Sequence, residues 1–272
     1  MRTAKFVREL PLHLLILPGL MLVILYSYVP MVGIVIAFQK FSPFDGLFGS
    51  KWVGLNNFKY VLEFPDVYRI MWNTVSIASM KIVFGLIVPI IVALLLNEMY
   101  HPRIKKWVQT LIYLPHFLSW VILSGILIDI LSPSEGIVNA ILGKFGIEPI
   151  FFLGDNSWFP KVLVASDVWK EFGFNTIVYL AALTGINPTL YEAAVVDGAN
   201  RWKQTWHITL PGILPIIVLL ATLSLGNVLN AGFDQIFNLY SPAVYESGDI
   251  LDTLIYRIGL NDAQYSVATA IG

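Results

Sequence analysis

Cysteine is absent from the 272 residues, and charged residues are scarce. The lack of cysteine excludes disulfide bonds, thiolate metal sites and cysteine nucleophiles, but it leaves the redox compartment undetermined. Only 13% of the residues are charged, whereas soluble domains carry about 25%. These charges are too few to cover a water-facing surface, so lipid is the expected solvent. The net charge of −1 gives no basis for binding nucleic acid.

The sequence also lacks the short motifs of several enzyme classes. No G-x-x-x-x-G-K-[ST] phosphate loop occurs, because Lys144 is followed by Phe145 instead of a hydroxyl residue. Neither H-E-x-x-H nor G-x-S-x-G is present, and the histidines are scattered rather than grouped with carboxylates. We therefore predict no catalytic and no metal-binding residues, and we interpret His116 as a structural polar residue at a helix start.

What the chain has instead is long apolar runs, within a composition that is 57% hydrophobic. A helix of about 20 apolar residues crosses the hydrocarbon core of a bilayer. The first run is too long for a cleavable signal peptide. We expect an all-α fold, a polytopic transmembrane helical bundle of six spans in one domain over 1–272. The predicted spans are 12–38, 70–99, 107–131, 162–183, 211–231 and an incomplete 263–272.

The last run is too short to cross a bilayer, so we expect the given chain to lack the rest of a sixth span; a short re-entrant end is the alternative. Orientation follows from lysine and arginine, which favour cytoplasmic loops. They cluster before the first span, after the second and between the fourth and fifth, which predicts a cytoplasmic N-terminus. The clusters are Arg2, Lys5 and Arg8; Arg103, Lys105 and Lys106; Arg201 and Lys203.

The cytoplasmic segment 187–211, here called the elbow, is predicted to form two short helices with a sharp turn between them. Asn187 is a good N-cap, and Pro188 suits the first helical position. Gly198 can adopt the left-handed conformation that ends a helix, and Asn200 can cap the second helix. Small side chains near the turn would let another backbone approach, and Arg201 offers charge to a partner. The residues alone leave open whether a partner docks here or the loop is merely solvated.

The elbow resembles the EAA loop of ABC importer permeases. That loop reads Glu-Ala-Ala, a glycine four residues later and, after nine more residues, Ile-x-Leu-Pro. Asp197 matches an acid that is common before the glycine. The resemblance implies that the loop is a coupling helix seated in a groove of an ATPase subunit, with Glu192 as the docking acid. The matching residues are Glu192, Ala193, Ala194, Gly198, Ile208, Leu210 and Pro211.

Other segments extend the resemblance to carbohydrate permeases of the MalF/LplB-like, binding-protein-dependent type. It implies a multi-pass protein of the bacterial cytoplasmic (inner) membrane that is not itself an enzyme. Its expected partners are a second homologous permease, an ATPase dimer, an extracytoplasmic sugar-binding protein and membrane lipid. ATP and magnesium would bind to the ATPase, and no cofactor to this chain. The residues that carry this part are Trp52, Gly54, Asn57, Phe58, Asn73, Thr74, Tyr113, Leu114 and Pro115.

Polar residues inside the predicted spans are candidates for the path of the sugar. Buried amides without partners are costly, and ionisable groups within spans usually face a cavity or a partner. We nominate Trp169, Asn175, Asn227 and Asn230 as a substrate path, with hydrogen bonding between helices as the alternative role. Asp167 and Lys170 are three residues apart and can pair on one helix face.

Three other kinds of membrane protein are alternatives to a carbohydrate ABC permease. A secondary transporter would be expected to show inverted repeats, which are not visible, and it would leave the elbow without a role. A membrane-embedded enzyme would need a catalytic cluster within the spans. An ABC permease for amino acids or another solute is a closer rival, and only the resemblance of the first external segment argues against it.

Overall fold

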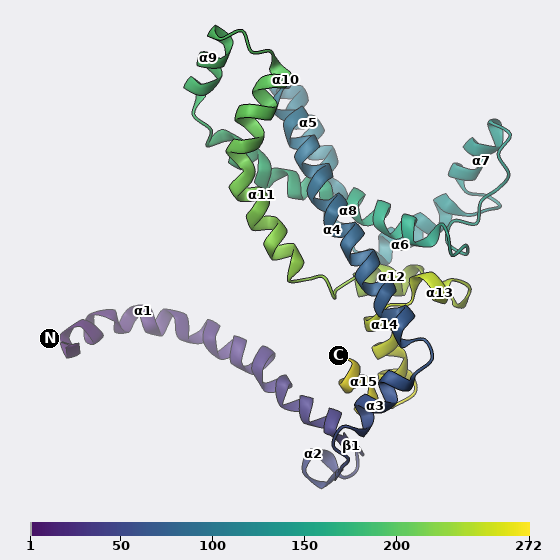
Figure 1. Ribbon diagram of the computed structural model, residues 1–272. Helices are drawn as coiled ribbons and strands as arrows, with labels where there is room; N and C mark the ends of the chain where they lie inside the picture. Colours follow the sequence, from purple (N-terminus) through teal and green to yellow (C-terminus); the bar gives the residue numbers. More distant parts are fainter. Residues whose placement is uncertain (1) are drawn as a thin grey trace. The chain divides into compact units, whose positions relative to one another are not determined.

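A computed structural model describes the backbone of residues 2–272 and the side chains of residues 11–272. The side chains of Arg2, Lys5 and Arg8, which bear on the orientation of the first span, lie outside this described part. The described chain is helical almost throughout, which confirms the all-α class (Figure 1). Its strands are β1 (Gln39–Lys40) and β2 (Lys51–Trp52), which pair antiparallel.

The first of two compact units consists of residues 1–67 and 254–272. Its N-terminal apolar run, Pro11–Phe38, is a helical stretch of 28 residues that is long and apolar enough to cross a bilayer. The final helix α15 (Tyr265–Ile271), in the region of the predicted incomplete span, packs against the end of this stretch. The other elements of this unit are α1 (Arg2–Val23), η1 (Ile24–Tyr28), η2 (Val29–Phe38), α2 (Gly46–Gly49), α3 (Asn56–Glu63) and η6 (Arg257–Asn261).

Trp52, Asn57 and Phe58, which carry part of the resemblance, pack beside η2 in this unit. The Asn57 amide donates to the carbonyls of Ala37 at 2.7 Å and Gln39 at 2.9 Å. The Phe38 ring lies between those of Trp52 and Phe58, with ring centroids 5.7 and 5.2 Å away. These residues therefore fold the chain back after its first apolar run.

The second unit, residues 68–253, contains the remaining helices. Two of its helical stretches, Val67–Asn97 and Arg201–Leu225, are long and apolar enough to span a bilayer. The elements of this unit are α4 (Val67–Asn97), α5 (Pro102–Tyr113), η3 (Leu114–Phe117), α6 (Trp120–Leu131), α7 (Ile137–Lys144), α8 (Phe159–Thr184), α9 (Pro188–Val196), α10 (Arg201–Gln204), η4 (Thr205–Thr209), α11 (Leu210–Leu225), α12 (Phe233–Leu239), η5 (Pro242–Val244) and α13 (Tyr245–Gly248). The helix α14 (Leu251–Tyr256) lies across the boundary between the units.

The region of the predicted third span, 107–131, is divided into two helices bent by 102°. Pro115 lies in η3, where it cannot donate a backbone hydrogen bond, and the chain at Leu118 and Ser119 is extended. The Ser119 side chain then caps α6 by accepting a hydrogen bond from the Ile122 N–H at 3.4 Å. The hydropathy of the run predicts its helices but carries no signal for this bend.

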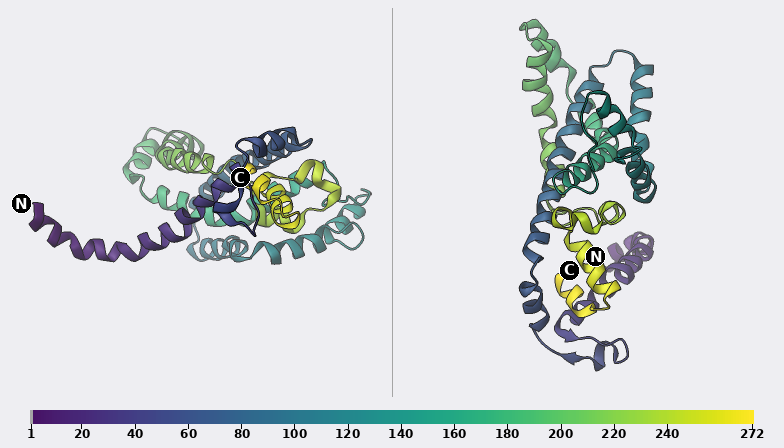
Figure 2. Two further views of the ribbon diagram at one scale, coloured as in Figure 1. Left: turned by 90° about the horizontal axis from the view of Figure 1, so that it is seen from below. Right: turned by 90° about the vertical axis from the view of Figure 1, so that its right-hand side faces the viewer.

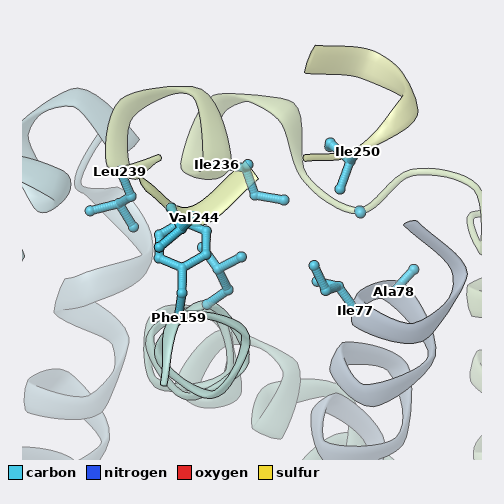
Figure 3. Close-up of a cluster of buried hydrophobic side chains, with 9 residues drawn as sticks. Ile77, Ala78, Phe159, Ile236, Leu239, Val244 and Ile250 are labelled. Atoms are coloured by element: carbon cyan, nitrogen blue, oxygen red, sulfur yellow. The ribbon is translucent and has the colours of Figure 1, made fainter. Parts of the chain in front are cut away.

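Two buried apolar clusters hold the second unit together. The larger one joins α4 and α8 to the segment after α11, with Ile77 and Phe159 among its residues (Figure 3). A smaller one joins α4, α8 and α11 through Ala93, Tyr179 and Ile213. Most other large apolar side chains are exposed, as expected where lipid or partner helices, rather than water, cover the surface.

Asn73 and Thr74, which form the N-T pair of the resemblance, fasten the last segment of this unit to α4. The Asn73 amide donates to the carbonyls of Glu246 at 3.0 Å and Asp249 at 3.2 Å. The Thr74 hydroxyl oxygen accepts from the Leu251 N–H at 2.9 Å. Both side chains are buried, so their role in this chain is structural.

The helices α5 and α8 approach each other closely at Gly173. A Cβ added to Gly173 would overlap the backbone carbonyl oxygen of Ile112 and would lie 3.1 Å from the Tyr113 nitrogen. Small residues at helix crossings are typical of membrane bundles, because they let backbones pack at short range. Gly173 therefore fixes the crossing of these two helices.

A buried polar group, here called the Lys81 cluster, joins α4, α8 and the link between α11 and α12. Lys81 Nζ donates to the Ala231 carbonyl at 2.7 Å and to Gln235 Oε1, and lies 3.3 Å from Asp167 Oδ1. The Gln235 amide in turn donates to Ser166 Oγ at 2.8 Å. Every donor of Lys81 thus has an acceptor from another element, so this cluster sets how the three elements lie.

Replacing Gly173 with alanine is expected to destabilise the protein, because the added methyl group overlaps the Ile112 carbonyl. Overpacking of this kind costs about 1–3 kcal/mol. The midpoint of thermal unfolding in detergent is the measurement. Gly125→Ala in α6 is the matched control, since a Cβ there meets nothing within 4 Å. Equal losses in the two variants would contradict a close approach of α5 and α8.

Replacing Lys81 with methionine is expected to cost about 1–3 kcal/mol, because the half-buried Asp167 loses its ion-pair partner and the acceptors of Lys81 lose their donor. The double variant Lys81→Met/Asp167→Leu should recover much of this loss, since it removes both charges. Thermal unfolding of the three proteins in detergent measures both effects. A double variant that unfolds at a lower temperature than Lys81→Met would contradict the expected recovery.

Candidate functional site

The elbow has the two short helices and the sharp turn that its sequence predicts. Asn187 caps α9 by accepting from the Thr189 N–H at 3.1 Å, and Asn200 caps α10 by accepting from the Lys203 N–H at 2.9 Å. Between them Gly198 has a φ of 74°, in the left-handed region. The Ala199 N–H donates back to the Ala194 carbonyl at 2.8 Å and closes the turn.

The outer surface of the elbow is exposed. Glu192, Asp197 and Gly198 are all exposed, and the side chain of Val196 is 87% accessible. Among the described residues, neither acid has an ion-pair partner. Figures 1 and 2 show α9 and α10 at one end of the second unit, with α12 and α13 at the other. The elbow thus presents two acids and a bare turn to whatever lies beyond this end.

The second half of the motif returns the chain to the bundle. Leu210 packs against the cluster of Tyr179 and Ile213, and Ile208 is half-buried in η4. Pro211 follows the π-helical turn η4 at the start of α11, within the continuous helical stretch Arg201–Leu225. Tyr191 OH lies 3.0 Å from Thr209 Oγ1 and ties α9 to the start of α11. These residues hold the elbow to the helical bundle, whereas the Glu-Ala-Ala half of the motif lies on the surface.

Arg201 differs from its expected place. Its guanidinium is exposed, but it lies 2.5 Å from Glu98 Oε2 and donates to Tyr100 OH at 2.6 Å. Both partners lie at the end of α4 or just after it. The arginine therefore makes contacts within the chain, while Glu192, Asp197 and Lys203 remain exposed on the elbow.

Three of the four nominated path residues line one cavity of about 240 Å³ in the second unit. Asn175 comes from α8, and Asn227 and Asn230 come from the link after α11. Asn230 Oδ1 accepts from the Gly232 N–H at 3.1 Å, so its amide nitrogen remains available to a ligand. The lining also includes Lys81, Asp167 and Glu171. A set of amides and carboxylates such as this one suits the hydroxyl groups of a polar solute.

Trp169 lies apart from these asparagines. It lines a different, apolar pocket with Leu127, Phe152 and Trp158. Its position on α8 turns it away from the side that Asn175 occupies. The structure therefore separates the tryptophan from the other three nominated residues, and it adds three ionisable residues that were not nominated. Their signal in the sequence is the presence of charge within a predicted span.

The predicted pairing of Asp167 with Lys170 is wrong. Lys170 Nζ lies 2.8 Å from Glu171 Oε1 and donates to the His116 carbonyl at 3.0 Å, while Asp167 pairs with Lys81. His116 Nδ1 lies 2.7 Å from Glu171 Oε2, and its ring stacks on Phe174 at 4.1 Å. The histidine thus has a structural place at the break before α6. Asp167 finds its partner on α4, whereas Lys170 pairs with the adjacent Glu171 of α8 and with the His116 carbonyl.

No metal site is evident within the described part of the chain. No three histidine, cysteine, aspartate or glutamate side chains gather there in a way that could hold an ion. The chemistry that these residues support is binding through hydrogen bonds and ion pairs.

Comparison with known proteins assigns the family. Residues 85–233, which include the cavity asparagines and the whole elbow, match the family model described as "Binding-protein-dependent transport system inner membrane component". The polygalacturonan/rhamnogalacturonan transport system permease protein YteP of Bacillus subtilis is 43% identical over 268 residues, covering 98% of this chain and 84% of the relative. Protein LplB of the same organism is 40% identical over 269 residues, covering 99% and 85%.

A solved structure gives the same result for the fold. It is the crystal structure of a bacterial alginate ABC transporter in complex with an alginate pentasaccharide-bound periplasmic protein. One of its chains superimposes with a TM-score of 0.90 and 40% sequence identity, covering 99% of this chain and 90% of that one. The chain therefore belongs to the binding-protein-dependent transport system inner membrane components, as a helical membrane permease of the carbohydrate type of ABC importer.

Proposed function

We propose that the protein carries an oligosaccharide across the cytoplasmic membrane of a bacterium, as one of two permease subunits in an ATP-driven importer. One observation carries the proposal: the exposed elbow is continuous with two elements that line the polar cavity. The helix α8, which bears Asn175, ends at Thr184 just before the elbow, and α11, which bears Ser224, begins directly after it. A displacement of the elbow therefore acts on the cavity through the chain itself.

The proposed partners follow from this arrangement and from the family. ATPase subunits, which bind ATP and magnesium, would contact the elbow at Glu192, Asp197 and Gly198, so the elbow and the N-terminus are cytoplasmic. A second permease would complete the path, and an extracytoplasmic binding protein would deliver the sugar. The alginate transporter supports the last step, because it was solved with a sugar-bound periplasmic protein. Hydrolysis occurs in the ATPase, and this chain performs no catalysis.

The proposed path uses the cavity polar groups to replace the water that a sugar loses in the membrane. Asn175, Asn227 and Asn230 offer donors and acceptors to hydroxyl groups, which would be costly to bury without partners. ATP binding closes the ATPases and moves the elbow, and the spans then open to the outside. Each state is stabilised only by the contacts that differ between the two. The six-span arrangement is part of this proposal.

Glu192→Ala and Gly198→Asp are expected to reduce the amount of ATPase that co-purifies with the permease from detergent by about tenfold or more, which corresponds to ~1.4 kcal/mol. The first change removes an exposed acid of the contact surface. The second places a side chain on the bare turn and strains a left-handed backbone. The measurement is the ATPase content and ATP turnover of the purified complex.

Two variants in the loop that follows α7, at Gly146 and Glu148, are matched controls for the elbow variants. Gly146 has a φ of 75° and open space around it, as Gly198 has, so Gly146→Asp reproduces the backbone strain away from the elbow. Glu148→Ala removes an exposed acid from the same loop. Equal loss of the ATPase in Gly146→Asp and Gly198→Asp would mean that strain, and not contact, explains the result. A wild-type protein that brings down no ATPase and transports under an ion gradient would show that the proposed function is wrong.

Asn175→Leu is expected to lower sugar uptake into proteoliposomes several-fold, because each lost hydrogen bond to the solute is worth about 1 kcal/mol. The co-purifying ATPase should be unchanged, since the cavity is away from the elbow. Trp169→Leu is the comparison variant on the same helix, because it alters the other pocket. A loss of uptake in Trp169→Leu with full uptake in Asn175→Leu would place the path on the opposite side of α8.

A further inference from the structure

The elbow is joined by the chain to α8 and α11, but not to α4. Yet α4 supplies a whole wall of the cavity, including Ala78, Lys81 and Gly85. If ATPase closure is to reshape the cavity through this wall, the movement of the elbow has to reach α4 through side chains. The question is therefore which contacts join the elbow to the end of α4, at Asn97 and beyond.

The start of α11 packs on α4 through the cluster of Ala93 and Ile213, but packing between α10 and the segment after Leu95 is sparse. An apolar groove of about 730 Å³ separates the last turns of α4 from α10, η4 and α11. Ile91 and Leu95 line it from one side, and Trp202 and Trp206 from the other. All four side chains are at least half exposed. Beyond the apolar cluster of Ala93 and Ile213, open space lies between the end of α4 and α10, so little displacement passes directly across the groove.

Arg201 bridges this groove at its polar end. Nη1 lies 2.5 Å from Glu98 Oε2, and Nη2 donates to Tyr100 OH at 2.6 Å. The guanidinium carbon also lies over the Tyr100 ring, 5.6 Å from its centroid. Two donors of one planar guanidinium group thus bind two side chains, those of Glu98 and Tyr100, in the segment that follows α4. A planar fork of this kind sets orientation as well as distance.

We propose that Arg201, with Glu98 and Tyr100, is a clamp that carries displacement of the elbow to α4. Arg201 is a positioning residue: it touches neither sugar nor nucleotide, and it acts through the helix to which it holds. The inference rests on the proposed function, since it concerns how the ATPase contact reaches the cavity. The residue is outside the Glu-Ala-Ala and Ile-x-Leu-Pro parts of the motif.

Because the clamp is exposed, its loss can change coupling without lowering the stability of the fold. The side chains of Arg201 and Glu98 are 64% and 49% accessible, and exposed ion pairs contribute little to folding. Breaking the clamp should therefore leave a folded permease that still binds its ATPase. What it removes is the polar link between α10 and the segment that follows α4.

The test uses the assembled transporter in proteoliposomes with a sugar-loaded binding protein. The variants are Arg201→Glu, Glu98→Arg, the exchanged pair Arg201→Glu/Glu98→Arg, and Lys203→Glu. Lys203 is the matched control, because it is an exposed cation on the same short helix α10. The readouts are ATPase content, ATP turnover and sugar transported per ATP hydrolysed.

Arg201→Glu and Glu98→Arg should retain the ATPase but transport about five- to tenfold less sugar per ATP, within the range of typical coupling effects. The exchanged pair should regain transport, and Lys203→Glu should behave as the wild type. The clamp is wrong if Arg201→Glu transports normally, if the exchanged pair stays as poor as either single variant, or if Lys203→Glu loses as much.

A second measurement separates failure of the clamp from failure of the proposed function. The chain has no cysteine, so spin labels at His101→Cys and Val196→Cys report one distance between the end of α4 and the elbow. Arg201→Glu should broaden its distribution, and the exchanged pair should narrow it again. An unchanged distribution overturns the clamp alone. A wild-type permease that binds no ATPase overturns the proposed function, and the inference with it.

Discussion

The ion pair between Lys81 and Asp167 is the interaction on which the second unit depends. Within a bilayer a charged group cannot rely on water, so it has to be paired inside the protein. Lys81 meets this requirement with acceptors from α8 and from the link after α11, including the Ala231 carbonyl. This link lies against α4 as a result, and it carries Asn227 and Asn230 into the wall of the cavity. One charge requirement thus accounts for both a helix arrangement and a polar binding surface.

The elbow shows what the sequence can predict well. Its caps at Asn187 and Asn200 and its turn at Gly198 are local, since each depends on hydrogen bonds between residues no more than five positions apart. Apolar runs are likewise local signals, and they predict helices at Val67–Asn97 and in the stretch that ends at Leu225. The family resemblance rests on the same elbow, so the region that is best predicted is also the one that identified the family.

Contacts between helices were beyond the sequence. A spacing of three residues suggested that Asp167 pairs with Lys170, but Lys81, which is far away in the chain, lies closer. Trp169 was grouped with the asparagines by chemistry, although its place on α8 turns it to another pocket. The bend before α6 is not visible in the hydropathy of the sequence. Pro115 and the Ser119 cap change the direction of the helix axis without changing the polarity of the run. In the first two cases the deciding contact is set by the packing of whole helices, whereas the bend is set locally by Pro115 and Ser119.

The groove beside Trp202 and Trp206 has a mechanical consequence for the second unit. At one end α4 and the link after α11 are held together through Lys81 by short polar contacts. At the other end some 730 Å³ of open space lies between α4 and the helix that leads into α11. Relative motion of these helices is therefore most restricted at Lys81, whereas toward Glu98 it is limited by the apolar cluster of Ala93 and Ile213 and by the exposed Arg201–Glu98 pair. The helices of this unit are thus held most tightly beside the polar cavity and have most room to move at the end that bears the elbow.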